Sequence, residues 1–211
     1  MREGRTSAGA LAAAKSWLRA AAVAVALLLA PAVRADPGPA MTHVQRLLTE
    51  GQRVAAGGDR EAALGRLLDR DFDVELIART ALGPPYGRMS DPERGEYLAL
   101  FREHVVLSVV RQVVLTPVQD VAIIEARDTN GPESMIVTRV VDAQGRVRLA
   151  TWRVRAEGGR PKIIDVMVDG VSLATTRADE LRSVLQRNGG QVAALLASMR
   201  TQNTQMRTTP R

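Results

Sequence analysis

Residues 146–169 read RVRLATWRVRAEGGRPKIIDVMVD, and this stretch decides the fold class because its apolar side chains recur at every second position. Trp152 and Val154 alternate with polar residues in its first half, and Ile164 and Val166 do so in its second half. A period of two residues is typical of a strand with one buried face, and the Gly-Gly pair between the halves favours a tight turn. The stretch therefore predicts two neighbouring strands.

The same period continues upstream. Four strands are predicted in all, at 118–126, 134–142, 146–155 and 162–169. The gaps between them are too short for parallel crossovers, which indicates an antiparallel meander. One face of this sheet is apolar and must be covered, and helices are the only cover available. We therefore expect an α+β fold, in which helices cover one face of a four-stranded or slightly larger antiparallel sheet.

Helical periodicity precedes the sheet. Apolar residues recur at helical spacing through 41–56, and Asp59 and Asp73 are predicted to cap a second and a third helix. The run Ser-Asp-Pro-Glu at 90–93 is a capping box, in which the serine and the glutamate satisfy backbone groups of the first turn. The helix that it opens is predicted to be the longest and to reach about Val110.

Two more helices are predicted after the sheet, separated by Asn-Gly-Gly at 188–190. Residues 201–211 have no apolar periodicity, so we expect a disordered polar tail there. No interdomain linker is evident, and residues 36–200 are predicted to form one domain. Because no heptad pattern exists either, we expect a monomer.

The composition excludes several classes of function. The chain has no cysteine, which rules out disulfides and thiolate chemistry, and its two histidines cannot form a multi-histidine metal site. Of the 29 basic residues five lie in residues 1–35, opposite a single acidic one, so the rest of the chain is close to neutral. No basic stripe with interleaved aromatic residues remains, and we expect no nucleic-acid partner.

Residues 1–35 have the pattern of a signal peptide. A basic region ends at Arg19, an uninterrupted apolar run fills 20–30, and small residues at Val33 and Ala35 precede a predicted cleavage before Asp36. Eleven apolar residues are too few to cross a bilayer. The sequence therefore predicts export, with a retained N-terminal anchor as the alternative.

The search for catalytic groups is largely negative. Asp165 and Asp169 would share one strand face about 13 Å apart, which is too far for a catalytic carboxylate pair, so we expect solvated acids. His104 is the one weak candidate for a general base, on the long helix. We predict no enzyme, no catalytic residue, no metal and no cofactor.

Five segments resemble the toluene-tolerance family of MlaC-type periplasmic phospholipid-binding proteins. They are FDVELIARTALG at 72–83, SDPERGEYLALF at 90–101, TWRV at 151–154, DVMVDGVSL at 165–173 and ATTRADELRSVLQR at 174–187. They occur in the family's order and spacing, after an exported leader. The resemblance implies an apolar lipid cavity between the helices and the sheet.

The resemblance also implies a function: a carrier that holds phospholipid acyl chains and shuttles the lipid between inner and outer membrane. The implied partners are an inner-membrane ABC lipid transporter with its MCE-domain subunit and an outer-membrane lipoprotein complex. The residues expected to line the cavity are Ile77, Phe101, Val105, Val109, Ile136, Trp152, Val154, Ile164, Val166 and Leu173.

Three alternatives stay open. In the first alternative the cargo is a hopanoid or another lipid, because a branch of the family is associated with hopanoid-producing bacteria. The second is a chaperone-like module that binds protein and has a filled interior. The third is a cavity enzyme on a similar scaffold, which would need an acid/base pair inside the pocket. Bound lipid separates the first from the other two.

Overall fold

The computed structural model describes residues 38–129, 132–157 and 160–208, so the predicted signal peptide lies outside the described residues. The helices are α2 (Pro39–Ala56), α3 (Arg60–Asp71), α4 (Val74–Leu82), the short 3-10 helix η1 (Pro84–Arg88), α5 (Asp91–Leu115), α6 (Leu173–Arg187) and α7 (Val192–Thr208). The strands are β1 (Val118–Asp128), β2 (Glu133–Asp142), β3 (Val147–Glu157), β4 (Arg160–Val168) and β5 (Val171–Ser172). This order of elements confirms the predicted α+β class.

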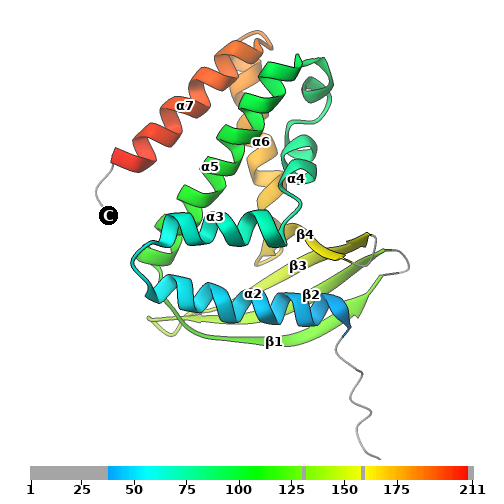
Figure 1. The fold of residues 1–211 in the computed structure, drawn as a ribbon, viewed down its shortest axis with the longest axis vertical. Coiled ribbons are helices and arrows are strands. Elements are labelled where there is room, and N and C mark those ends of the chain that lie inside the picture. Colours follow the sequence, from blue (N-terminus) through cyan, green and yellow to red (C-terminus); the bar gives the residue numbers. More distant parts are fainter. Residues whose placement is uncertain (1–37, 130–131, 158–159, 209–211) are drawn as a thin grey trace, which may run out of the picture. The chain divides into compact units, whose positions relative to one another are not determined.

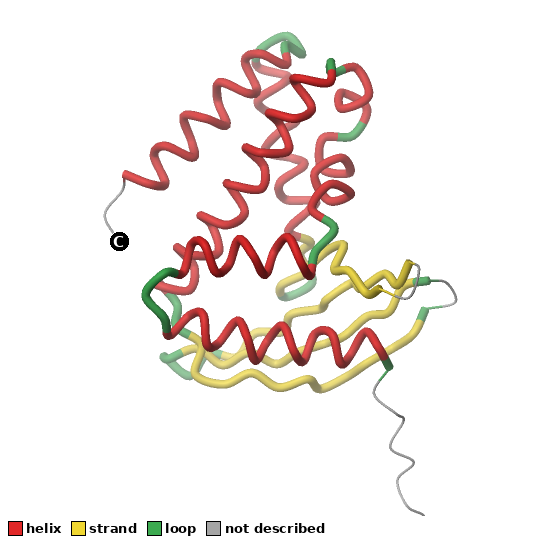
Figure 2. The backbone as a smooth tube through the Cα atoms, in the orientation of Figure 1, coloured by secondary structure: helices red, strands yellow, loops and turns green. Residues whose placement is uncertain are grey.

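The strands form one antiparallel sheet in the order β1-β2-β3-β4-β5, the predicted meander with a short fifth strand (Figure 2). The register places Ile136 opposite Trp152, and Trp152 opposite Val166, in one row across β2, β3 and β4. Such cross-strand apolar neighbours on one face are what the alternating sequence predicts.

Helices α2 and α3 cover the apolar face of the sheet, and α2 lies along it (Figure 1). The buried residues between them form what we call the sheet cluster: Ala40, Val44, Leu47, Leu67, Ile136, Val154 and Ile163. Further apolar residues pack at its margin: Met41, Leu48, Val54, Leu64, Phe72, Ile123, Trp152 and Val166. This layer is the interior expected between helices and sheet.

One detail of the predicted alternation is wrong. The pairing of β3 with β4 shifts, so that Arg153 faces Asp165 while Val154 faces Ile163. Ile164 is the extra residue of this bulge, and Ile163 takes its expected place in the sheet cluster. A bulge changes the face on which the following residues lie, and a simple period of two cannot reveal it.

The same region corrects the prediction of a solvated Asp165. Its carboxylate is buried and accepts hydrogen bonds from the Ser172 hydroxyl at 2.7 Å and the Val166 backbone amide at 2.8 Å. The Ala174 amide donates to it as well, at 3.3 Å. Asp165 thus stabilises the turn from β5 into the first residues of α6, whereas Asp169 is half-exposed and pairs with Arg148.

The remaining helices form a second apolar cluster beyond the sheet. In this helical cluster α5 packs against α7 and α4 packs against α6. Tyr97 lies fully buried at its centre and donates a hydrogen bond to the Ala78 carbonyl at 2.8 Å. The predicted capping box is present, because the Ser90 side chain accepts from the Glu93 backbone amide and the Glu93 carboxylate accepts from the Ser90 backbone amide, the latter at 2.8 Å. A third, small cluster of Leu68, Val106 and Val110 joins α3 to α5.

The prediction of a disordered polar tail from residue 201 is wrong for 201–208, because α7 continues through Thr208. Asn203 is buried, and its side-chain amide donates to the Leu100 carbonyl and the Glu103 carboxylate, both at 3.0 Å. Arg207 forms ion pairs with Glu61 and Glu103, each at 2.8 Å. The final turns are held by polar contacts, which apolar periodicity does not detect.

Candidate functional site

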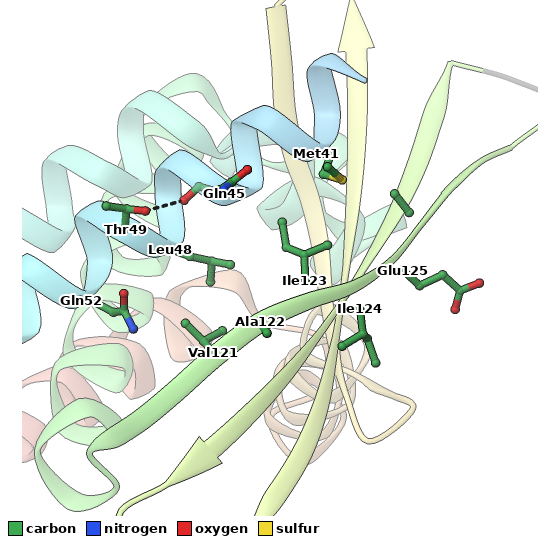
Figure 3. A pocket seen from close by; sticks show the side chains of 11 residues that line it. Met41, Gln45, Leu48, Thr49, Gln52, Val121, Ala122, Ile123, Ile124 and Glu125 are labelled. Carbon is green, nitrogen blue, oxygen red and sulfur yellow. Dashed lines mark hydrogen bonds between the residues drawn. The ribbon is translucent and has the colours of Figure 1, made fainter. Parts of the chain in front are cut away.

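A groove of about 520 Å³ runs between α2 and the edge strand β1 (Figure 3). Its α2 side consists of Met41, Gln45, Leu48, Thr49 and Gln52, and its β1 side is the stretch 121–126. The volume falls within the range of roughly 300–1,000 Å³ that is typical of small-molecule sites. The groove is therefore large enough for part of an elongated ligand.

The pleat of β1 decides which of its side chains face the groove. Figure 3 shows Ile123 pointing towards α2 and Met41, and Ile124 pointing to the other side of the strand. Ile124 is 53% exposed, whereas Ile123 is partly buried at the margin of the sheet cluster. The register of β1 against β2 shifts between Ile123 and Glu125, which bends the strand at the middle of the groove.

The groove is continuous with the apolar layer over the sheet. Three of its lining residues, Met41, Leu48 and Ile123, also pack against the sheet cluster. The side of α2 beyond them is polar, where the Thr49 hydroxyl donates to the Gln45 carbonyl at 3.0 Å. An elongated apolar ligand could therefore lie with its chain against the apolar layer.

Helix α2 is fastened to α3 by a buried polar network. The Asp71 carboxylate has no solvent exposure and accepts from Arg46 at 2.8 Å and from Arg70 at 2.7 Å. His43 lies beside it, with Nε2 3.2 Å from the Asp71 carbonyl and Nδ1 3.1 Å from the Arg46 guanidinium. The network joins α2 to the C-terminal end of α3.

The ionisation of this network follows from its surroundings. Burial works against the charged form of Asp71, but hydrogen bonds from Arg70 and Arg46 outweigh it and hold the pKa of the carboxyl below its usual value. Burial lowers the pKa of His43, and the neighbouring Arg46 adds to this effect. A neutral His43 can donate from Nε2 to the Asp71 carbonyl while Nδ1 accepts from Arg46.

The structure places seven of the ten predicted cavity residues in or against two clusters. Ile136 and Val154 are buried in the sheet cluster, and Trp152 and Val166 pack at its margin. The Trp152 ring is held in place because its Nε1 donates to the Thr138 hydroxyl at 3.1 Å. These four residues line the apolar layer that the groove reaches.

The predicted residues from the helices lie elsewhere. Phe101 is buried in the helical cluster, and Ile77 and Val105 pack against that cluster. Val105 also touches the third cluster. Val109 and Leu173 are 40% and 54% exposed, and Ile164, at the bulge, belongs to none of the three clusters. The ten residues thus do not form one wall.

The groove between α2 and β1 was not predicted from the sequence. Met41 and Leu48 are recognisable as apolar positions of the first helix, but the family resemblance begins only near residue 70 and directed attention to α5. Beside them, Gln45, Thr49 and Gln52 form the exposed polar face of the helix. Such a face is common to surface helices and gives no signal of a groove.

A second cavity, of about 490 Å³, lies between α3, α5 and α7 and has a charged lining that includes Asp59, Glu61, Glu103 and Arg207. His104 is also on α5, and its Nδ1 is 3.1 Å from the side-chain amide oxygen Oδ1 of Asn203. Burial and the charge of Arg177 lower the pKa of His104. No acidic and histidine side chains within the described residues form a group of three that could hold a metal ion.

Comparisons with known proteins find a curated relative, a solved structure of the same fold and a matching family. The toluene tolerance protein ttg2D of Pseudomonas putida is 23% identical over 131 residues, which cover 60% of this chain and 60% of that protein. A phospholipid-binding protein from Ralstonia solanacearum, solved in complex with a phospholipid, has the same fold, with a TM-score of 0.69 at 16% identity. That likeness covers 80% of this chain and 99% of the other. Residues 40–201, most of the chain, match the MlaC protein family, and the chain therefore belongs to it.

Proposed function

We propose that this protein is a periplasmic carrier that holds the acyl chains of a phospholipid between α2, α3 and the sheet. The observation that carries the proposal is the continuity of the α2–β1 groove with the sheet cluster through Met41, Leu48 and Ile123. Family membership and the phospholipid-bound relative of the same fold support it. The proposal includes no cofactor and no catalytic step.

The energetics explain why such a carrier needs an apolar layer. A diacyl lipid exposes about thirty methylenes, which costs on the order of 24 kcal/mol in water at about 0.8 kcal/mol each. The walls that the sheet cluster and its margin offer are aliphatic, apart from Phe72 and Trp152. Walls of this kind suit acyl tails and select little among head groups, which leaves hopanoid or another lipid as the alternative cargo.

We place the carrier between the two membranes, with an inner-membrane ABC transporter bearing an MCE-domain subunit and an outer-membrane lipoprotein complex as its partners. This part of the proposal follows from family membership and from the leader at 1–35. No helix within the described residues is long and apolar enough to cross a bilayer. Export should be accompanied by cleavage between Ala35 and Asp36. N-terminal sequencing of the periplasmic protein should read Asp-Pro-Gly-Pro; an intact Met1 on membrane-bound protein would contradict it.

A matched pair of substitutions on β1 tests the groove. Ile123→Asp places a carboxylate where the acyl chains are proposed to lie, at a cost of several kcal/mol unless the carboxylate reaches water. Val118→Asp introduces the same charge at the start of β1, at a 48% exposed position outside the groove. We expect Ile123→Asp to lose bound phospholipid at least about tenfold and Val118→Asp to retain it.

The measurement is phosphorus content and lipid mass of protein purified from the periplasm, beside its thermal unfolding. Leu48→Gln, on the α2 side of the groove, serves as a second variant if Ile123→Asp does not fold. A folded Ile123→Asp protein with its full complement of lipid would show that the tails do not lie in this groove.

A further inference from the structure

Arg177 occupies a position of α6 where an apolar residue is expected. Together with Leu181 and Val184 it lies on the buried stripe of the helix, and it is only 8% exposed. Arginine is almost never this deeply buried unless its charge is paired. Among the described residues its ion pair is with Glu180, whose side chain is 55% exposed, so that water largely screens the pair.

The hydrogen bonds of Arg177 are incomplete on one side of the guanidinium. Nη1 donates to the Glu180 carboxylate at 2.7 Å. Nε and Nη2 are both buried, and neither has a hydrogen-bond partner within the part of the chain that the structure describes. Buried donors without partners are rare in folded proteins, and each one calls for an explanation such as a bound ion.

The two unpartnered donors form a recognisable unit. Nε and Nη2 are the edge of the guanidinium whose N–H groups point in parallel, and this edge binds two oxygens of one carboxylate or phosphate group. A point-charge cation such as lysine lacks this geometry. Glu180 uses the opposite side, so the paired edge is available to a second acceptor.

Glu180 is the carboxylate that pairs with Arg177, and Glu103 also acts on the neighbouring His104. The charge of Arg177 reaches Tyr97 and His104, both on α5, and lowers the pKa of His104. The Tyr97 hydroxyl already donates to the Ala78 carbonyl, and Nδ1 of His104 is bonded to Asn203. An anion at the Arg177 edge would therefore meet one buried positive charge and a neutral imidazole.

We propose that the Nε–Nη2 edge of Arg177 is a binding site for one phosphate-type oxyanion. Two sources share this chemistry: the phosphodiester of a lipid and free inorganic phosphate. Assigning the phosphodiester of the cargo rests on the proposed function, whereas free phosphate would occupy the same edge without it. The site is separate from the groove, because α6 leaves the sheet at β5 and the groove borders β1, at the opposite edge.

The test uses the mature protein after removal of lipid, with three probes: inorganic phosphate, phosphatidylglycerol, and diacylglycerol with the same acyl chains. Phosphate binding is followed by NMR through the ring signals of His104. An anion on Arg177 offsets the positive charge that lowers the pKa of His104, so phosphate should raise that pKa in the wild type. Lipid binding is followed as the dissociation constant for each lipid.

Arg177→Gln removes the charge and the paired edge, and Arg177→Lys keeps the charge without the edge. Arg182→Gln is the matched control, because Arg182 is an exposed arginine of the same helix with its own i,i+3 partner, Asp179. Loss of a charge-assisted, two-donor contact should weaken binding of phosphate or phosphatidylglycerol at least about tenfold in both Arg177 variants. The control should bind as the wild type does.

The outcomes separate the two sources. If the Arg177 variants bind phosphatidylglycerol more weakly but diacylglycerol as the wild type does, the ligand is the lipid phosphodiester. If the variants lose only the His104 response to inorganic phosphate, the ligand is free phosphate. Wild type that binds neither lipid refutes the proposed function, and the phosphate titration still decides the oxyanion site. The inference is overturned if neither phosphate nor phosphatidylglycerol perturbs His104 in the wild type, or if both Arg177 variants respond as the wild type does.

Discussion

Several contacts between distant segments of this protein are made by single buried polar residues. Asp71, His43 and Asn203 are each buried and each join segments that are far apart in the sequence. Local patterns could predict His104 as a helix residue but not its contact with Asn203, which lies 99 positions away. Local patterns could not predict the burial of Asp165 either, because it depends on a bulge and on the turn into α6. Sequence analysis identifies such residues poorly because their partners are set by tertiary contacts.

The two histidines make stability depend on pH. Burial lowers the pKa of His43 and of His104 below the ordinary 6.5 in the folded protein. The unfolded chain therefore binds more protons at mildly acidic pH, and the free energy of unfolding falls as pH drops below about 6.5, by at most about 1.4 kcal/mol per histidine for each pH unit. Urea unfolding at pH 7.5 and 5.5 should show this loss.

The matched variant is His43→Gln combined with His104→Gln, which should show a smaller loss between the same two pH values even if it is less stable throughout. The paired carboxyls of Asp71 and Glu133 have lowered pKa values, so their contribution disappears only at more acidic pH. An equal loss in the wild type and the double variant between pH 7.5 and 5.5 would exclude the histidines as the cause.

At the scale of elements, regular patterns predicted most of the architecture. Alternation located the four long strands of the sheet, and the capping box at 90–93 located the start of α5. The groove could not be predicted because it depends on how α2 lies against the edge of β1, which neither segment encodes alone. The last two turns of α7 were missed because polar contacts of Asn203 and Arg207 replace an apolar stripe there.

The C-terminal turns of α7 should contribute to stability. A chain that ends at Arg200 loses Asn203, which leaves the buried Leu100 carbonyl without that donor, and loses the ion pairs of Arg207. One buried hydrogen bond to an uncharged group contributes about 1 kcal/mol, and truncation should cost about 2–3 kcal/mol in all. Chemical denaturation measures it, with a chain ending at Thr208 as the control. Equal stability of the two chains would show that these turns do not dock.

At the scale of the whole molecule, the sheet with α2 and α3 forms one apolar layer, and α4 to α7 form another, with α3 and α5 in contact between them. The family resemblance implied a cavity between helices and sheet, and four of the ten predicted residues border that layer. Which of the two layers borders the groove could not be predicted, because both are similarly apolar in sequence. We assign the cargo to the layer that the groove borders.

The most direct test of this account is native mass spectrometry of the wild-type protein purified gently from the periplasm. The account predicts a cleaved polypeptide that carries the mass of one bound phospholipid, released on denaturation and identifiable in the lipid extract. Added phospholipid should restore that mass after delipidation. A protein at the mass of its polypeptide alone, which takes up no lipid from vesicles, would contradict the account.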